Sequence, residues 1–304
     1  MEIHSYAAFL AVAEHESFSL AAEKLHLTQP AVSKRIAQLE SSLGVALFDR
    51  LGRRVTLTEA GRALRPVAER ILREVRETRQ VIANLSAEIS GPLSVVTSHH
   101  IGLRRLPPIL KDYARRHPAV RLDLAFMDSE QACQAVERGE FELGVVTLPL
   151  RPAPTLDITP LWDDPLVIAV APDHPLARQE SVTLDELGQH PAILPAVGTY
   201  TRTIIEATIL QRHGALDVIL ETNYLETLRT MVAIGLGWSA LPRKMLGEDV
   251  VEVAVEGLDI KRTLGIVTHI VRTPSHAAQA LRKILHASAD IDATPLQPTQ
   301  AVGD

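Results

Sequence analysis

Residues 17–44, SFSLAAEKLHLTQPAVSKRIAQLESSLG, decide the fold of the amino-terminal part of the chain. Thr28 is a good cap for a helix over residues 29–43, and Pro30 falls in its first turn, where the missing N–H costs nothing. Gly44 follows as the carboxyl-terminal cap. The apolar residues of this helix recur on one face, at Val32, Ile36, Leu39 and Leu43.

A shorter helix precedes this one. An apolar stripe from Ile3 predicts a first helix that ends near His15, and Ser19 is the expected cap of a second helix over residues 20–25. Ala21 and Ala22 allow close helix packing in that second helix. Two short helices joined by a tight connection predict a helix-turn-helix.

A two-stranded wing is expected next. Residues 47–50 and 53–58 flank a turn at Gly52, and the second run is rich in β-branched residues. Arg53 and Arg54 are placed near the tip of this wing.

The pattern from Thr58 to about Ile89 is strongly helical. Apolar residues follow a near-heptad seam, at Leu64, Val67, Ile71, Val75, Ile82, Leu85 and Ile89. The flanking faces are charged all round, which favours a self-association helix. A long helix that lies on its own domain is the alternative.

Composition restricts the class of protein. The chain has 304 residues, 46% of them apolar, which predicts about two domains with ordinary cores. Its single cysteine, Cys133, excludes an intrachain disulfide and is expected to be structural. There is no charged-then-apolar leader and no apolar run near the roughly 20 residues of a membrane span, so we expect a reducing, cytoplasmic compartment and no membrane contact.

Charge is unevenly distributed. Residues 20–65 hold 8 basic and 4 acidic residues, whereas the whole chain has a net charge of −6. A basic segment on an acidic body is typical of a nucleic-acid contact region, and also of an ordinary solvated face.

Beyond Ser90-Gly91-Pro92, strand-like and helix-like runs alternate, which predicts an α/β fold with a parallel sheet. A proline-rich stiff connector is expected over residues 149–160. Strands are expected at residues 93–97, 120–127, 141–148, 166–171, 192–194, 218–221, 237–241 and 264–271. Helices are expected at residues 103–116, 129–138, 201–213, 224–234 and 275–289.

The amino-terminal residues resemble those of the LysR-type bacterial transcriptional regulators. The resemblance rests on Ala21-Ala22, Leu25, Thr28-Gln29-Pro30-Ala31-Val32-Ser33, Ile36, Leu39-Glu40, Leu43-Gly44, Leu47-Phe48, Arg50, Thr56-Leu57-Thr58 and Gly61. A looser resemblance continues through Gly144-Val145-Val146, Gly235-Leu236-Gly237-Trp238 and Leu241-Pro242.

This resemblance implies an α/β chain with three parts and a tail. It implies a winged helix-turn-helix over residues 1–58, a linker and dimerisation helix over 59–90, and a flexible tail over 291–304. Residues 91–290 are then a two-lobed, periplasmic-binding-protein-like effector domain. Lobe I covers about 91–160 and 265–290, and lobe II about 161–264.

The function implied is sequence-specific DNA binding modulated by a small polar or anionic metabolite, without a cofactor. Its expected partners are promoter DNA, a second copy of the chain through the linker helices, a tetramer of such chains, and RNA polymerase. The alternatives are an enzyme on the two-lobed body and a constitutive DNA-binding protein without a ligand. No nucleophile elbow, P-loop, dinucleotide fingerprint or HExxH motif supports the enzyme.

Candidate site residues follow from position. Polar residues at the start of a recognition helix reach base edges or phosphates, and wing arginines suit a narrow minor groove. The expected DNA contacts are Thr28, Gln29, Pro30, Ser33, Lys34, Arg35, Arg53 and Arg54, with Lys24 as a weaker candidate.

Ligands of two-lobed α/β domains lie at the carboxyl ends of strands. The expected effector contacts are Thr97, Ser98, His99, His100, Ser129, Thr147, Thr199, Tyr200, Thr201 and Asn223. His99, His100 or Arg202 is expected to supply charge, although a hydrogen-bonded turn is the alternative for the paired histidines. Two adjacent histidines without a third ligand do not indicate a metal site.

Overall fold

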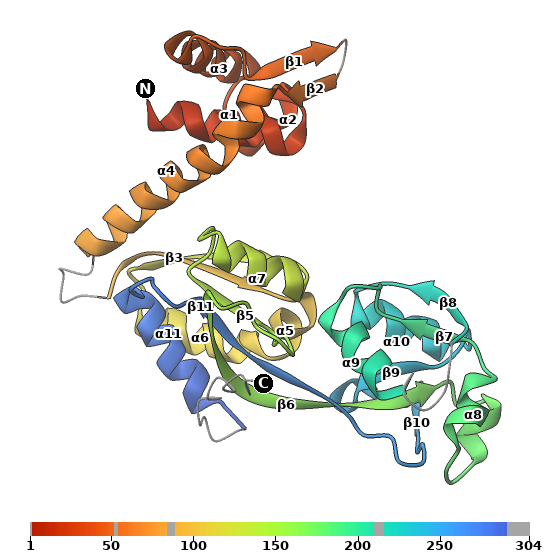
Figure 1. The fold of residues 1–304 in the computed structure, drawn as a ribbon. Coiled ribbons are helices and arrows are strands. Elements are labelled where there is room, and N and C mark those ends of the chain that lie inside the picture. The colour runs from red at the N-terminus through yellow and green to blue at the C-terminus, as the bar shows by residue number, and fades with distance from the viewer. Residues whose placement is uncertain (1, 52–53, 84–88, 210–215, 291–304) are drawn as a thin grey trace, which may run out of the picture. The chain divides into compact units, whose positions relative to one another are not determined.

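The computed structural model describes residues 2–51, 54–83, 89–209 and 216–290. The predicted turn at Gly52, the wing residue Arg53 and the predicted tail over 291–304 lie outside the described residues. The chain forms two compact units, Met1–Ser86 and Ala87–Asp304, which are described separately below (Figure 1).

The amino-terminal unit is a helix-turn-helix followed by a two-stranded wing and a long helix. Its elements are α1 (Ile3–His15), α2 (Phe18–Lys24), α3 (Gln29–Leu43), β1 (Phe48–Leu51), β2 (Arg54–Leu57) and α4 (Glu59–Ala83). The wing strands are antiparallel. The predicted bounds of α3 are confirmed, and its cap Gly44 has a φ of 72°, which a glycine adopts without strain.

The cap of α2 differs from the prediction. Ser17, not Ser19, precedes the helix, and its Oγ accepts a hydrogen bond from the backbone N–H of Leu20 at 3.3 Å. The earlier start brings Phe18 into the helix, where its ring lies 5.9 Å from that of Phe48 in the core. Burial of this aromatic ring therefore fixes the start of α2.

The described part of helix α4 reaches Ala83, and residues 84–88, with the predicted seam residue Leu85, lie outside the described residues. Ile89 is not helical, so the predicted helix does not extend to Ile89. Part of its apolar seam faces its own unit, because Leu64 and Ile71 pack against the core and Ala68 is fully buried. The alternative of a helix that lies on its own domain thus holds for this first portion.

The carboxyl-terminal unit contains a seven-stranded sheet in the order β10-β6-β11-β5-β3-β4, with β9 also paired to β6. A separate parallel pair, β7-β8, confirms two predicted strands. The strands are β3 (Gly91–Thr97), β4 (Val120–Phe126), β5 (Leu143–Thr147), β6 (Leu156–Val170), β7 (Ala192–Leu194), β8 (Val218–Glu221), β9 (Ser239–Pro242), β10 (Val251–Val253) and β11 (Ile260–His269).

The helices of this unit cover the sheets (Figure 1). They are α5 (His99–Arg104), α6 (Leu106–Arg116), α7 (Ser129–Glu137), α8 (Leu184–Gly188), α9 (Tyr200–Ile209), α10 (Leu225–Ala233) and α11 (His276–Ala287), with short 3-10 helices at Pro175–Arg178 and Arg243–Met245. The predicted helix over 103–116 is divided at Arg105 into α5 and α6. Prolines at 107 and 108 explain the division, because they suit the first turn of a new helix and not a helix interior.

The parallel sheet predicted from the alternating run over residues 93–148 is confirmed, because β3, β4 and β5 are parallel. The later strands β6 and β11 run antiparallel to their neighbours. The predicted stiff connector is wrong at its end, because Pro160 lies inside the 15-residue strand β6. The register shifts between Leu264 and Gly265 of the partner strand, opposite this proline, and such irregularities accommodate a residue that lacks an N–H.

Strands β6 and β11 pass through two separate cores, which define two lobes. The first lobe packs around Leu93, Leu143, Leu161, Trp162, Leu264 and Leu281. The second lobe packs around Leu166, Ile168, Ile205, Trp238 and Ile260. Residues 163–165 and 261–263 therefore cross from one lobe to the other.

Gly61 sets how closely α4 approaches the wing. A Cβ on Gly61 would overlap the carbonyl oxygen of Leu47 and lie 2.8 Å from Leu57 Cδ2. We expect Gly61→Ala to lower the free energy of unfolding of the amino-terminal unit by about 1–3 kcal/mol, because backbone has to move. Calorimetric unfolding of the full chain measures this effect. Ala63→Ser, at an exposed position two residues along, is the control, and an equal loss in both variants would contradict the packing argument.

Candidate functional site

The start of helix α3 presents a polar surface on the amino-terminal unit. Val32, Ile36 and Leu39 are buried on the opposite face, which fixes the rotation of the helix. Thr28, Gln29, Pro30 and Lys34 are exposed, and Ser33 and Arg35 are half-buried. Gln29 Nε2 donates a hydrogen bond to Ser33 Oγ at 3.1 Å, so these two side chains are already aligned.

The wing is joined to α3 by a carboxylate. Glu40 Oε1 accepts hydrogen bonds from the backbone N–H groups of Leu47 at 2.7 Å and Phe48 at 3.4 Å. Thr58 Oγ1 donates to the carbonyl of Ala46 at 2.8 Å and accepts from the N–H of Gly61 at 3.0 Å. These bonds fix the entry to the wing relative to both α3 and α4. Of the two predicted wing arginines, Arg54 begins β2, and Arg53 is not described.

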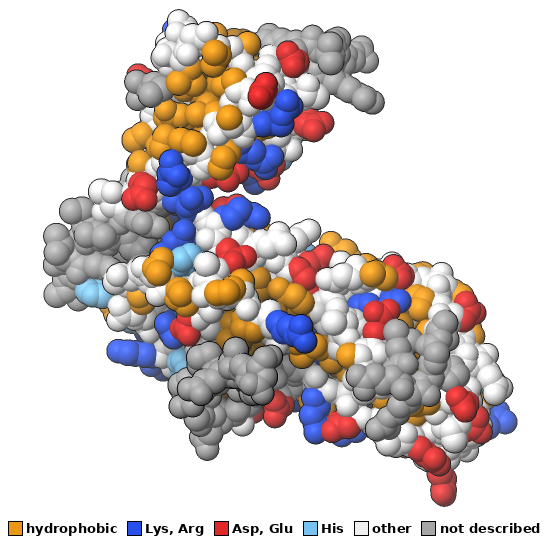
Figure 2. All heavy atoms as spheres, viewed as in Figure 1, with side chains coloured by type: hydrophobic (Ala, Val, Ile, Leu, Met, Phe, Trp, Pro, Cys, Tyr) orange, Lys and Arg blue, Asp and Glu red, His pale blue; other side chains and the backbone are white. Residues whose placement is uncertain are grey.

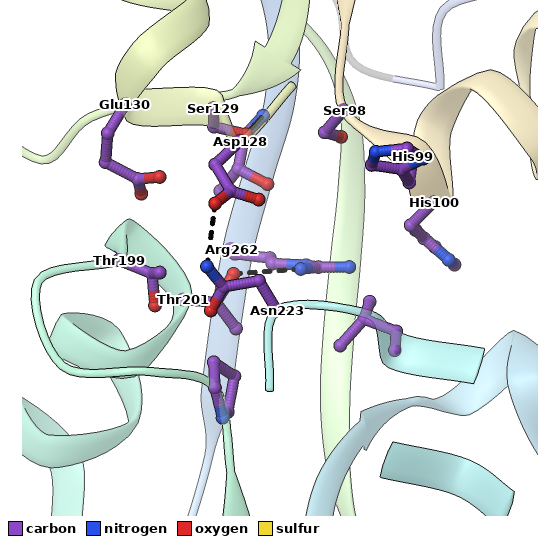
Figure 3. A pocket seen from close by; sticks show the side chains of 13 residues that line it. Ser98, His99, His100, Asp128, Ser129, Glu130, Thr199, Thr201, Asn223 and Arg262 are labelled. Atoms are coloured by element: carbon purple, nitrogen blue, oxygen red, sulfur yellow. Dashed lines mark hydrogen bonds between the residues drawn. The ribbon is translucent and has the colours of Figure 1, made fainter. Parts of the chain in front are cut away.

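The second candidate site is a cavity of about 50 Å³ between the two lobes of the carboxyl-terminal unit (Figure 3). Eight of the predicted effector residues line it: Ser98, His99, His100, Ser129, Thr147, Thr199, Thr201 and Asn223. The remaining lining residues are Asp128, Glu130, Pro195, Leu225 and Arg262.

Two predicted effector residues do not line this cavity. Thr97 is fully buried, and its hydroxyl donates to the carbonyl of Val145 at 2.7 Å, between β3 and β5. Tyr200 packs against the apolar cluster around Cys133. Arg202 does not supply charge to the cavity either, because it pairs with Glu206 at 2.7 Å and Glu221 at 3.0 Å.

Arg262 supplies the positive charge in its place. It lies on β11 directly opposite Asp164 on β6, within the segments that cross between the lobes. Arg262 Nε donates to Asp164 Oδ2 at 2.8 Å, and Nη1 donates to Thr201 Oγ1 at 3.0 Å. Both charged residues are buried, with 4% and 2% of their surface exposed. Arg105 Nη2 lies 3.8 Å from the other oxygen of Asp164.

A sequence signal for Arg262 exists in the strand pattern. Ile260, Arg262 and Leu264 alternate along β11, and the two apolar residues are buried, so an arginine stands at a core-facing position. Buried arginines are paired, which makes such a position a candidate for a buried ion pair. The partner could not be named without the register of β6 and β11.

Two carboxylates lie at the start of α7, on the first lobe. Asp128 Oδ2 accepts a hydrogen bond from Asn223 Nδ2 of the second lobe at 2.7 Å, as Figure 3 shows. Glu130 accepts a hydrogen bond from the backbone N–H of Tyr200. Burial raises the pKa of Glu130, and the neighbouring Asp128 charge acts in the same direction. An ion pair between Arg104 and Glu226, at 3.3 Å, also joins the lobes. The lobes are therefore in direct contact around the cavity.

The paired histidines differ in environment. His99 packs between two aromatic rings, with its centroid 4.9 Å from Tyr224 and 5.6 Å from Phe126. His100 is buried, and burial together with the Arg262 charge lowers its pKa to about 4. His100 Nδ1 has no hydrogen-bond partner among the described residues, so the alternative of a hydrogen-bonded turn has no support.

Cys133 and the metal-ligating residue types were candidates for chemistry at a site. Cys133 is buried, and burial raises the pKa of its thiol to about 11. No group of three histidine, cysteine, aspartate or glutamate side chains in the described part of the chain is placed to hold a metal ion. No described helix is long and apolar enough to cross a membrane.

Comparisons with known proteins identify the family. Residues 3–62 match the family model described as "Bacterial regulatory helix-turn-helix protein, lysR family", and residues 86–290 match the model described as "LysR substrate binding domain". The chain belongs to the LysR family. It is a DNA-binding transcriptional regulator with an effector-binding domain and not an enzyme.

Similar proteins are found along the whole length of this LysR-family chain. A "RuBisCO operon transcriptional regulator" of Allochromatium vinosum is 30% identical over 286 residues, 92% of this chain and 94% of the relative. An uncharacterised HTH-type transcriptional regulator of Azotobacter vinelandii, from an ibpB-leuC intergenic region, is 64% identical over 108 residues, 36% of this chain and 75% of the relative. The crystal structure of full-length CbnR complexed with its target DNA has a TM-score of 0.66 at 21% identity, covering 95% of this chain and 100% of that one. This likeness shows that the two chains share a fold.

The buried Asp164–Arg262 pair of the LysR-family effector domain is open to a direct test. Asp164→Asn keeps the shape but leaves the Arg262 charge buried without its partner, so we expect a loss of about 3–5 kcal/mol in the free energy of unfolding. Both tryptophans of the chain lie in this unit, so their fluorescence follows its unfolding in urea. Glu252→Gln is the control, because it breaks an exposed pair with Arg243 and is expected to cost at most about 1 kcal/mol.

His100 gives the stability of this unit a pH dependence. Its pKa is about 4 in the folded protein and 6.5 ordinarily, so the unfolded chain takes up the proton first and stability falls as the pH drops from 6.5 towards 4. Between pH 7.5 and pH 5, the uptake of a proton by this group in the unfolded chain lowers the free energy of unfolding by about 2 kcal/mol. Over this pH interval, we expect the free energy of unfolding of His100→Gln to fall by about 2 kcal/mol less than that of the wild type. If the free energies of unfolding of the two proteins, measured in urea, fall in parallel between pH 7.5 and pH 5, this role of His100 is contradicted.

Proposed function

We propose that helix α3 reads the operator in the major groove. The proposed contact residues are Thr28, Gln29, Pro30, Ser33, Lys34 and Arg35 on this helix, with Arg53 and Arg54 of the wing in the minor groove. The observation that carries this proposal is the exposure of the polar first turns of α3 while its apolar stripe is buried. Lys24, near the end of α2, is exposed and is proposed as a phosphate contact.

Residue chemistry suggests how these contacts divide. Gln29 can pair with an adenine edge through its amide, and Ser33, which it meets at 3.1 Å, is an adaptable donor or acceptor. Lys34 is exposed and can reach a guanine or a phosphate. Glu40 acts through position only, because its hydrogen bond to the N–H of Leu47 orients the wing relative to α3.

We propose that the cavity between the lobes holds the effector. Hydroxyl groups of Ser98, Ser129, Thr147, Thr199 and Thr201 line it, together with the guanidinium of Arg262. Polar groups that converge on a cavity between two lobes support a small polar metabolite as the ligand. Effector binding changes DNA affinity only if the ligand binds one arrangement of the protein more tightly than another.

We propose further that the regulator acts as a homodimer through its linker helices, and that effector-domain contacts join two such dimers into a tetramer. Figure 2 shows hydrophobic side chains gathered on the visible face of the amino-terminal unit, and an exposed apolar surface supports self-association. The proposed divisions are residues 1–58, 59–90, 91–290 and 291–304. A regulator that binds promoter DNA acts in the cytoplasm of a bacterium, with RNA polymerase as a proposed contact.

Substitutions on α3 test the DNA contacts. We expect Ser33→Ala and Lys34→Ala each to weaken binding to a promoter fragment of the protein's own gene by about tenfold or more, because each removes a base or phosphate contact. Lys34→Ala is also expected to lower the slope of log K against log salt by about 1 if its contact is to phosphate.

Fluorescence anisotropy over a salt series measures both effects. Ser41→Ala, exposed near the far end of the same helix, is the matched control and is expected to bind like the wild type. Light scattering verifies that the oligomer is intact. Unchanged operator affinity in both Ser33→Ala and Lys34→Ala would contradict the proposed interface.

A further inference from the structure

The cavity between the lobes separates two opposite charges. On one side, Asp128 and Glu130 stand at the start of α7 and both line the cavity (Figure 3). No lysine or arginine of the described residues forms an ion pair with either carboxylate. Burial raises the pKa of Glu130, and among charged groups only Asp128 acts on it. This side of the cavity holds negative charge that the described part of the protein leaves unneutralised.

The other side of the cavity carries a guanidinium. Arg262 pairs with the buried carboxylate of Asp164 at 2.7 Å, whereas Arg105 lies 3.8 Å from Asp164 and 3.5 Å from Asp290 and does not line the cavity. Arg262 Nη1 reaches into the cavity to Thr201 Oγ1. His100 also lines the cavity, with 8% of its surface exposed and its Nδ1 unpartnered among the described residues. A buried polar nitrogen beside a guanidinium is a ready partner for an acidic group of a ligand.

We propose that the effector is a small zwitterion of the amino-acid type. Its ammonium group lies between Asp128 and Glu130, and its carboxylate lies at Arg262 and His100. This inference rests on the proposed function of the cavity as the effector site, and it adds the charge pattern of the ligand.

Simpler ligands fit the charges less well. A carboxylic acid without an ammonium group adds a third negative charge to a cavity that already holds two carboxylates. An amine without an acid leaves Arg262 and His100 without a new partner. A ligand with both groups matches the two sides at once.

The contacts between the lobes leave room for this ligand. The Asn223 amide donates a hydrogen bond to Oδ2 of Asp128, and the Tyr200 N–H donates one to Oε1 of Glu130. A carboxylate accepts about four hydrogen bonds in all, so each can bind an ammonium group while the contact between the lobes persists.

The test uses the full chain and matched sets of small molecules. Each of the twenty standard amino acids is compared with its 2-hydroxy acid and with its decarboxylated amine, by calorimetric titration at one ionic strength. We expect at least one amino acid to bind, with both of its analogues weaker by about tenfold or more, because each leaves a buried charge without a partner.

Substitutions place the ammonium group. Glu130→Gln and Asp128→Asn keep an oxygen for the contacts between the lobes but remove a charge. Each is expected to lower the affinity for the bound amino acid by about tenfold. Glu252→Gln is the matched control, because it removes an exposed carboxylate that neither lines the cavity nor joins the lobes, and the affinity of this variant is expected to stay within about twofold of that of the wild type. Tryptophan fluorescence verifies that each variant is folded.

Three results would overturn the proposal: no amino acid binds, a 2-hydroxy acid binds as tightly as its amino acid, or Glu130→Gln and Asp128→Asn both leave the affinity unchanged. The proposed function fails separately. If a hydroxy acid binds, changes operator affinity and is weakened by Thr201→Val, the cavity remains the effector site and only the zwitterion is excluded. If every bound ligand is insensitive to Thr201→Val, Glu130→Gln and Asp128→Asn, the cavity itself is not the site.

Discussion

The effector domain depends on one pair of buried opposite charges at the point where its two lobes join. Among the elements that the structure describes, only β6 and β11 enter both cores, and Asp164 and Arg262 face each other across these strands. A buried guanidinium is tolerated only when its charge and its hydrogen bonds are satisfied, so this pair holds the two strands in one register. The same guanidinium reaches Thr201 of the second lobe, while Arg105 approaches from the first. Arg262 of this pair therefore also lines the cavity between the lobes.

This arrangement gives a ligand a means to act on the lobes. Direct contacts around the cavity include packing of Tyr200 against the cluster around Cys133 and of His99 against Tyr224. The polar contacts are those of Asp128 with Asn223, of Glu130 with the N–H of Tyr200, and an exposed pair of Arg104 with Glu226. Each such contact contributes little net free energy, because water offers the same partners when the lobes separate. A ligand that adds bonds to both lobes can thus shift their arrangement with a modest difference in affinity. The strands, by contrast, keep the lobes attached in every arrangement.

Sequence patterns predicted what is local and missed what is long-range. Helix α3 was predicted to the residue, because its cap, its proline and its glycine all lie within it or next to it. Eight cavity residues were predicted because parallel strands end at the same edge of a sheet, which brings residues after separate strands together. Arg262 and Asp164 were missed because their roles arise from a pairing across 98 positions that only the register of two strands defines. Pro160 was wrongly predicted to lie in a connector, because a strand can carry a proline where its register is irregular.

The two functional surfaces therefore differ in how they are built. The polar face of α3 and its link to the wing through Glu40 and Leu47 depend on contacts only seven positions apart. The cavity requires side chains from six separate stretches of the chain, at residues 98–100, 128–130, 147, 195–201, 223–225 and 262, and its negative and positive sides come from different strands and helices. Asp128, Glu130 and His100 stand on the first lobe, whereas Arg262 lies on the segment that crosses to the second lobe and meets Thr201 there. A ligand bound at Arg262 therefore lies beside a contact with the second lobe, so its binding depends on the arrangement of the lobes through the Arg262–Thr201 contact.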